Sequence, residues 1–422
     1  MKKDVFKFII KEFHESPLLD TYARSLQLPS TKKIIALVGS RRAGKTSYFY
    51  NLIKNLIEEK KIKKDQIIYI NFEDDRLYPL ELADLNDLLE AYYELYPDNK
   101  EKTIYFFFDE IQNIKNWESF IRRLDDTKKS KIFVTGSSSK LLSKEIATAL
   151  RGRSLAYHLF PLSFKEFLIF KKIDLTKNYE YSSQRFKVKN ALEEYLEFGG
   201  FPEVVLEQKR LKNKILSNYF DMFIYKDLVE RFAIRNTTLL KSLSKYLLTN
   251  LSNLFSITAY HKAISKEMPV GKDTLMEYLS YLEDINFMYF LQMFSYSAKK
   301  QQLNPKKVYC VDGGLRNVVA LKNSKDLGRL VENIVFIELK KQEKEIYYWK
   351  NNNEVDFVIK NKDATLEAIN VTYTNEITER EIKGLNEFEK EFKKTKKVII
   401  TKDLEKVEEG ITYIPLWKWL LM

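Results

Sequence analysis

The chain has 422 residues, of which 45% are hydrophobic and 14% aromatic, so it exceeds the size of a single core and we expect about three domains. One cysteine, Cys310, and three histidines exclude a disulfide framework and a Cys/His zinc site. The formal net charge of +12 favours an acidic partner such as nucleic acid, although a lysine-rich composition produces the same charge without any such partner.

The sequence contains no membrane signal that we recognise. No uninterrupted apolar run approaches the ~18 residues of a spanning helix, and the start MKKDVFKFII lacks the apolar core and cleavage site of a signal peptide. We therefore expect a cytoplasmic protein without a membrane partner.

The first predicted domain covers residues 1–162 and alternates short apolar runs with amphipathic stretches, which is typical of a parallel sheet covered by helices. Helical periodicity fills the gaps, for example in residues 47–59 and 117–125. The predicted strands are residues 34–38, 66–72, 103–108 and 131–134. The pattern predicts an α/β nucleotide-binding core.

The segment IIALVGSRRAGKTSYFY places the pattern G-x-x-x-x-G-K-T between an apolar strand and a helical stretch, as a phosphate-binding P-loop requires. Backbone N–H groups of such a loop face the phosphates of ATP. We expect Lys45 to reach the β and γ phosphates, and the Thr46 hydroxyl to coordinate Mg²⁺. The predicted nucleotide-binding residues are Gly39, Ser40, Arg41, Arg42, Ala43, Gly44, Lys45, Thr46 and Ser47.

Two adjacent carboxylates end the apolar strand TIYFFFDEI. We expect Asp109 to hold Mg²⁺ through water. Glu110 is the predicted catalytic base, because phosphoryl transfer to water needs a group that orients or deprotonates the attacking water. Hydrolysis of ATP is the expected reaction.

Further candidate residues follow the next strand, KIFV. Ser137, in TGSSS, is the predicted sensor of the γ phosphate, although an ordinary Gly/Ser turn is an alternative. Arg151 and Arg153, in LRGRS, could reach developing phosphate charge in a neighbouring subunit, with solvated surface arginines as the alternative. We choose Arg153 as the candidate catalytic arginine.

Beyond the core the pattern becomes mostly helical, with a predicted helical subdomain over residues 163–236. Residues 237–320 contain three predicted helices followed by the strands NFMYFLQMF and KKVYCV. Three helices with a terminal hairpin describe a winged helix-turn-helix.

Double-stranded DNA is a candidate partner of this winged helix. Its proposed recognition helix, VGKDTLMEYLSYLEDI, is poorly suited to phosphates, since it holds one lysine against several acids. The wing turn, AKKQQLNPKK, is a better candidate for backbone contacts, with solvated surface lysines as the alternative. Its lysines are Lys299, Lys300, Lys306 and Lys307.

Residues 325–422 read as a helix, the strands EIYYW, EVDFVI and LEAINVTY, a second helix, and the strand KKVIIT. This order predicts a second small α/β domain.

The motifs together resemble archaeal and bacterial AAA-type ATPases with a DUF4143-like C-terminal region. The resemblance covers nearly the whole chain and rests on GSRRAGKT, INFEDDRL, FFFDEIQNIKNWESFIRRL, VTGSSSKLLS, LRGRS with PLSFKEFL, GGFPEVV, and GRLVENIVFIEL with EVDFVI. It implies a P-loop NTPase core of the ASCE type, a helical lid, a winged helix and a restriction-endonuclease-like tail.

The tail departs from the pattern of such nucleases, which need two acids and a nearby lysine around Mg²⁺. Glu332 and Asp356 match the first positions. In one alignment Glu367 is the second acid and Ile369 takes the lysine position; in the other, Asn370 and Thr372 replace the acid and the lysine. Neither alignment supplies the lysine, so we expect a retained fold without nuclease activity.

The leading hypothesis is an ATP- and Mg²⁺-dependent switch that acts on or near DNA. One alternative is a signalling or protein-remodelling ATPase with a protein target; another is an ATP-gated nuclease. A homo-oligomer is also compatible with the arginine positions.

Overall fold

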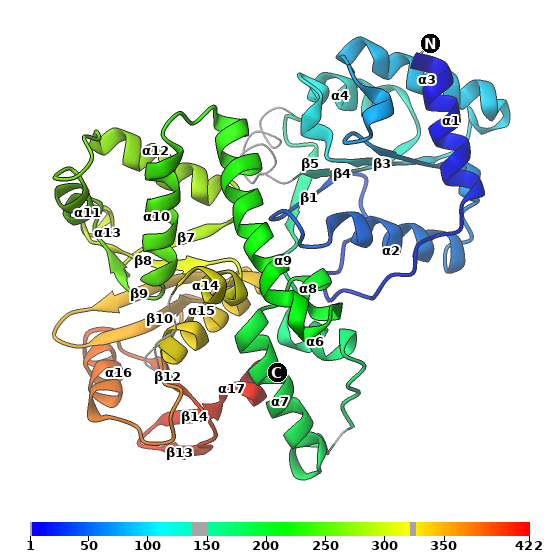
Figure 1. The fold of residues 1–422 in the computed structure, drawn as a ribbon. Coiled ribbons are helices and arrows are strands. Elements are labelled where there is room, and N and C mark those ends of the chain that lie inside the picture. Colours follow the sequence, from blue (N-terminus) through cyan, green and yellow to red (C-terminus); the bar gives the residue numbers. More distant parts are fainter. Residues whose placement is uncertain (1, 137–149, 177, 321–325) are drawn as a thin grey trace. The chain divides into compact units, whose positions relative to one another are not determined.

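The computed structural model describes residues 2–136, 150–176, 178–320 and 326–422. The chain divides into two compact units, Met1–Leu159 and Phe160–Met422, each with its own sheets and hydrophobic cores (Figure 1). Among the described residues, no helix is both long enough and apolar enough to cross a bilayer.

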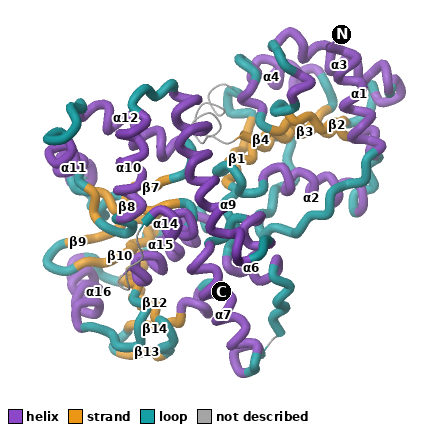
Figure 2. The backbone as a smooth tube through the Cα atoms, viewed as in Figure 1, coloured by secondary structure: helices purple, strands orange, loops and turns teal. Residues whose placement is uncertain are grey.

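The first unit is built on a parallel sheet in the order β2-β3-β4-β1-β5, of which β1 to β4 lie side by side in Figure 2. The strands are β1 (Ile34–Val38), β2 (Ile67–Asn71), β3 (Ile104–Asp109), β4 (Ser130–Gly136) and β5 (Ser154–His158). Every pairing is parallel, so the carboxyl ends of all the strands meet at one edge of the sheet.

Helices pack on both faces of this sheet. They are α1 (Lys2–Glu15), α2 (Lys45–Glu58), α3 (Leu85–Leu95) and α4 (Trp117–Thr127). Successive residues of a strand point to opposite faces, so Val38 lies in a core with residues of α3 and α4, while Leu37 lies in a core with residues of α2. The apolar runs that identify these strands follow from burial on both faces.

The structure confirms the predicted α/β core with its parallel sheet. The four predicted strands correspond to β1 to β4 within two residues at each end. The fifth strand, β5, lies at the edge of the sheet, and most of its side chains are half-buried. Its sequence SLAYH therefore lacks the apolar run by which the other strands are recognised.

The second unit begins with helices that follow the core. They are α6 (Phe164–Phe170), α7 (Gln184–Phe198), α8 (Pro202–Leu206) and α9 (Lys209–Met222), and α9 continues into a π-helical stretch, Phe223–Glu230. The motif PLSFKEFL starts α6 with a capping box: the Ser163 hydroxyl accepts from the Glu166 N–H at 3.2 Å, and the Glu166 carboxylate accepts from the Ser163 N–H at 2.8 Å.

Residues 237–320, here called the middle segment, contain helices and a small antiparallel sheet in the order β6-β8-β7. Their bounds are α10 (Thr237–Thr249), β6 (Leu254–Phe255), α11 (Ile257–Ile264), α12 (Lys272–Asp284), β7 (Met288–Leu291), α13 (Ala298–Leu303), β8 (Lys306–Cys310) and α14 (Gly313–Val319). The three predicted helices and the two predicted strands are present, and the assignment as a winged helix stays a prediction.

A buried carboxylate ties this segment to the loop of the motif GGFPEVV. Asp312 accepts from the N–H of Gly200 at 2.6 Å and from that of Gly314 at 2.8 Å. Burial raises the pKa of Asp312 to about 6, against the effect of these backbone N–H groups.

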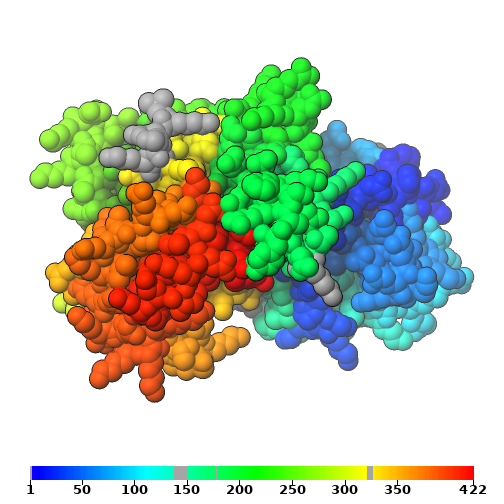
Figure 3. Space-filling view, turned by 90° about the horizontal axis from the view of Figure 1, so that it is seen from below, coloured from blue at the N-terminus to red at the C-terminus, as the bar shows by residue number. Residues whose placement is uncertain are grey.

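The C-terminal domain, residues 326–422, is a six-stranded sheet with helices, in the order β13-β14-β12-β11-β10-β9. Its elements are α15 (Asp326–Lys341), β9 (Glu345–Lys350), β10 (Glu354–Lys360), β11 (Leu366–Val371), α16 (Glu379–Glu391), β12 (Thr395–Thr401), β13 (Lys406–Glu408), β14 (Ile411–Pro415) and α17 (Leu416–Trp419). In Figure 3 its red residues lie against green residues of the α7 region. Lys418 and Glu180 form an ion pair of 2.6 Å across this boundary.

Candidate functional site

The predicted P-loop connects the end of β1 to the start of α2 at the carboxyl edge of the sheet. Gly44 has φ 95°, a conformation that favours glycine. A Cβ atom at Gly39 would lie 2.2 Å from the carbonyl oxygen of Leu159, so no larger residue fits there without a shift of the backbone. The backbone conformation at Gly44 and the close contact at Gly39 therefore explain why the motif has glycine at both positions.

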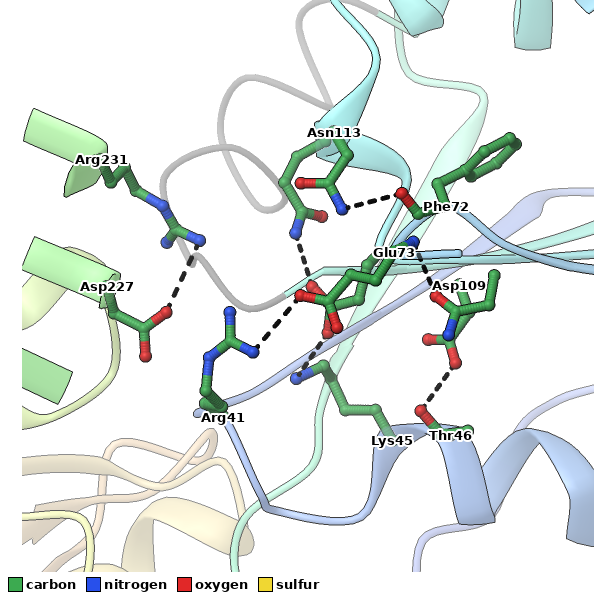
Figure 4. A network of polar contacts seen from close by, with 12 residues as sticks. Arg41, Lys45, Thr46, Phe72, Glu73, Asp109, Asn113, Asp227 and Arg231 are labelled. Carbon is green, nitrogen blue, oxygen red and sulfur yellow. Dashed lines mark hydrogen bonds and ion pairs between the residues drawn. The ribbon is translucent and has the colours of Figure 1, made fainter. Parts of the chain in front are cut away.

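Lys45 is buried at the base of this loop (Figure 4). Its Nζ atom lies 3.2 Å from the carbonyl oxygen of Gly39, 3.3 Å from that of Ser40, and 3.4 Å from Oε1 of Glu110. The Ser40 hydroxyl is buried and has no hydrogen-bond partner in the described part of the chain. The ammonium thus joins the loop to the carboxylate after β3.

Asp109 ends β3 and is fully buried. Its Oδ2 accepts from the hydroxyl of Thr46 at 2.6 Å and from that of Tyr69 at 3.0 Å, while its Oδ1 accepts from the Thr135 hydroxyl. Burial raises the pKa of Asp109, and the Thr135 and Thr46 hydroxyls oppose that shift. The structure therefore brings together the two predicted Mg²⁺ residues, Thr46 and Asp109.

Glu110 is the next residue and has φ 53°, which turns the chain sharply after the strand. Its Oε2 accepts from the Gln112 amide at 2.5 Å. Burial alone would raise the pKa of Glu110, but the Lys45 ammonium, the Gln112 amide and the Arg41 guanidinium together lower it. The carboxylate is consequently ionised at neutral pH, as a base must be.

Thr135, at the end of β4, is a site residue that the sequence motifs do not mark. Its hydroxyl donates to Asp109 and accepts from the Glu110 N–H at 2.9 Å, so it holds both carboxylate residues. The signal available in the sequence is its position as the first hydroxyl residue after KIFV. Ser137, the predicted sensor, lies outside the described residues.

Other residues of the predicted loop have identifiable neighbours. Arg41 forms an ion pair of 3.4 Å with Glu73, in the loop after β2 (Figure 4). The carbonyl oxygen of Ala43, which is buried, accepts from Arg24 at 3.0 Å. Arg42 has φ 66°, a left-handed conformation.

Arg153 immediately precedes β5, so it lies at the amino edge of the parallel sheet, opposite the P-loop edge. Its guanidinium pairs with Asp126 at 3.0 Å and with Asp125 at 4.0 Å. Within one chain the structure does not bring Arg153 to the phosphate site. Its predicted role in a neighbouring subunit stays a prediction.

The wing lysines differ in exposure, and one prediction about them is wrong. Lys299 and Lys300 are exposed on α13, as a DNA backbone contact requires. The side chain of Lys307 is only 1% exposed and touches three carboxylates, so it cannot contact DNA. Strand β8 begins at Lys306, which places Lys307 inside the sheet and not in the wing turn.

Of the two residues aligned with the second acid of the tail, Asn370 is the one that contacts Asp356. The Asp356 N–H donates to Oδ1 of Asn370 at 3.0 Å. Glu367 instead pairs with Lys396 at 3.0 Å. The described residues include no group of three or more His, Cys, Asp or Glu side chains arranged to hold a metal ion.

Comparison with known families agrees with this geometry. The sequence model of the family described as "AAA domain" matches residues 31–168. Those of two domains of unknown function, DUF8612 and DUF4143, match residues 189–326 and 327–419. The chain is 38% identical over 408 residues to the uncharacterized protein MJ1544 of Methanocaldococcus jannaschii, covering 92% of this chain and 88% of that one. An uncharacterized protein of Haemophilus influenzae is 32% identical, with 94% and 96% covered.

A structure of the Aeropyrum pernix ORC1 protein in complex with DNA is 12% identical and covers 75% of this chain and 91% of that one, with a TM-score of 0.31. The two relatives, matched over most of their length, and the matching family models show the family: the chain belongs to the AAA-type P-loop ATPases that carry a DUF4143 C-terminal region.

Proposed function

We propose that this nucleotide-binding AAA protein hydrolyses ATP in a Mg²⁺-dependent reaction. The observation that carries the proposal is the convergence of Lys45, Thr46, Asp109 and Glu110 at one edge of a parallel sheet. These side chains come from two separate segments, the P-loop and the end of β3, so their meeting reflects the fold and not their spacing in the sequence.

The residues present fit a magnesium ion. Mg²⁺ takes oxygen ligands and keeps several of its waters, and the hydroxyl of Thr46 and the carboxylate of Asp109 supply oxygens 2.6 Å apart. Thr46 would bind the ion directly and Asp109 through water. The ion would offset charge on the phosphates of the bound nucleotide.

The protein's own groups account for the remaining requirements of hydrolysis. The P-loop N–H groups and the positive end of α2 favour the phosphates, and Lys45 would exchange its carbonyl partners for phosphate oxygens. Glu110 would accept a proton from the water that attacks the γ phosphorus, as the bond from that phosphorus to the leaving ADP oxygen breaks.

The test is phosphate release from ATP by the purified full chain, with Mg²⁺ and with excess EDTA. We expect hydrolysis only with Mg²⁺, and we expect Asp109→Asn to reduce it strongly. Glu101→Gln is the matched control, since Glu101 is an exposed carboxylate of the same unit. Metal-independent hydrolysis, or full activity in Asp109→Asn, would contradict the proposal.

We further propose that the switch acts on or near DNA. The supporting observations are the net charge of +12 and the exposed lysines of α13, Lys299 and Lys300. Duplex DNA should stimulate ATP hydrolysis more at about 50 mM salt than at about 200 mM, because phosphate contacts release counterions. Lys299→Ala with Lys300→Ala should weaken this stimulation. No stimulation by DNA would favour the alternative, a protein target.

A homo-oligomer is the setting in which Arg153 could act. We propose that it would then leave Asp126 and approach the nucleotide of a neighbouring subunit. Hydrolysis per subunit should rise with protein concentration in the wild type and not in Arg153→Ala. Concentration-independent hydrolysis would contradict this role.

A further inference from the structure

Strand β8 presents its two faces to different parts of the second unit. Val308 and Cys310 belong to the hydrophobic core of the helices. Lys307 and Tyr309 alternate with them and point the opposite way, toward the C-terminal domain. Lys307 is therefore a lysine in the interior of a sheet, with its whole side chain taken out of water.

Three carboxylates surround the Lys307 ammonium. Its Nζ atom lies 3.0 Å from Glu332 on α15, and 2.7 Å and 2.8 Å from Glu354 and Asp356 on β10. The Tyr309 hydroxyl donates to the same Glu332 oxygen at 2.7 Å. The three carboxylate side chains are 12%, 16% and 15% exposed, against 1% for Lys307, so the ammonium fills the inner end of the cluster.

Lys307 and the carboxylates shift one another's pKa values. Burial alone would lower the pKa of Lys307, but the carboxylates outweigh that effect and raise it well above the usual value. Burial, and then the charge of Asp356, raises the pKa of Glu332 to about 8. A second ammonium group, that of Lys350, lies 3.3 Å from Glu354.

Independent contacts join the same two parts of the chain. Met293, just after β7, forms a parallel bridge with Tyr348 of β9, and the Phe294 N–H donates to the Tyr348 carbonyl at 2.6 Å. The ring of Phe294 lies in the core of the C-terminal domain. The Asn333 side chain on α15 accepts from the Cys310 N–H at 2.8 Å and donates to the Cys310 carbonyl at 3.1 Å.

We propose that Glu332, Glu354 and Asp356 form an ammonium-binding site whose occupant is Lys307 of the middle segment. The site fastens the C-terminal domain to the middle segment, so that the two act as one body. It also sets an ammonium group beside Glu332 and Asp356, the two acids that match the first positions of the nuclease pattern. In this proposal the domain serves attachment.

Removal of the ammonium tests this proposal, because breaking a buried ion pair leaves uncompensated charges behind. Lys307→Met keeps most of the side-chain length and removes the charge. Lys299→Met is the control, since Lys299 is exposed on α13. The rescue variant combines Lys307→Met with Glu332→Gln and Asp356→Asn, which removes two of the three carboxylates, while Glu354 keeps Lys350 as its partner at 3.3 Å.

The measurements are calorimetric unfolding of the full chain and hydrogen exchange of peptides from β8, β10 and α15. We expect Lys307→Met to lower the unfolding temperature of the second unit by on the order of 10 °C, and to speed exchange in all three elements. Lys299→Met should shift it by about 2 °C at most. The rescue variant should regain most of the loss.

Three results would overturn the proposal. Lys307→Met could be as stable as Lys299→Met, which would show that the ammonium does not stabilise the attachment of the C-terminal domain. The rescue variant could unfold at the same temperature as Lys307→Met. If Lys307→Met is insoluble, a folded rescue variant supports the site and an insoluble one overturns it. Wild type could cut duplex DNA with Mn²⁺ and lose this activity in Lys307→Met, which would make Lys307 a catalytic lysine.

Discussion

Replacing Thr135 by valine removes one hydroxyl and almost no volume, so it isolates the role of that hydroxyl in the nucleotide site. The change takes a hydrogen bond from buried Asp109 and leaves the Glu110 N–H without its acceptor. A hydrogen bond to a charged group is worth about 1.5–3 kcal/mol, and an unsatisfied buried donor costs about 1–3 kcal/mol. The free energy of unfolding should therefore fall by about 2.5–6 kcal/mol.

Thermal unfolding followed by circular dichroism would report this as a loss on the order of 10 °C. ATP hydrolysis should fall at least about tenfold, because Asp109 and Glu110 lose their shared support. Thr135→Ser keeps the hydroxyl, and Thr127→Val removes an exposed one that donates to the Arg123 carbonyl. Both controls should stay near wild type. If Thr135→Val matches Thr135→Ser in stability and in turnover, the reasoning is refuted.

Three further predictions concern single residues. Lys45→Ala should abolish ATP binding in a titration with a fluorescent analogue while circular dichroism shows an intact fold; normal binding would remove Lys45 from the site. Tyr69→Phe should lower the free energy of unfolding by about 1–3 kcal/mol in a urea titration, because Asp109 loses a buried donor; an unchanged midpoint would contradict this. Burial destabilises the ionised form of Asp312 and raises its pKa, so the free energy of unfolding should be highest below pH ~4 and should fall as the pH rises through about 6. This fall, about 3 kcal/mol, should be absent in Asp312→Asn. If the free energies of unfolding of Asp312→Asn and wild type changed with pH in parallel, the prediction would be wrong.

The nucleotide-binding core was predictable because its signals are local. An apolar strand, a glycine-rich loop and a helix follow one another in residues 34–58, and Asp109 and Glu110 end a second apolar strand. These features need no knowledge of which strands pair. β5 has no such signal, since an edge strand with half-buried side chains needs few apolar residues.

Thr135 could not be identified in this way, because its role depends on the order of the strands. Strand β4 pairs with β3, and this register sets the Thr135 hydroxyl beside Asp109. A Thr-Gly-Ser sequence alone reads as a turn. The strand order enters only through the folded sheet.

Lys307 shows the same dependence on tertiary structure more strongly. The nuclease pattern places its lysine close in sequence to the second acid, near Glu367 or Asn370, whereas the lysine that contacts Asp356 comes from β8, 49 residues earlier. Alternation in KKVYC offered a partial signal, because Val308 and Cys310 mark one buried face. That the other face is also buried follows only from the packing of the C-terminal domain.

The central claim is that Glu110 activates the water that attacks bound ATP, and Glu110→Gln tests it most directly. The amide keeps the size of the side chain and loses its basicity, so ATP should bind with a dissociation constant near that of wild type while turnover falls by about 10²–10⁴-fold. The measurement is ATP binding by calorimetry together with single-turnover hydrolysis of labelled ATP, with Glu101→Gln as the control. Wild-type turnover in the Glu110→Gln variant would contradict the claim.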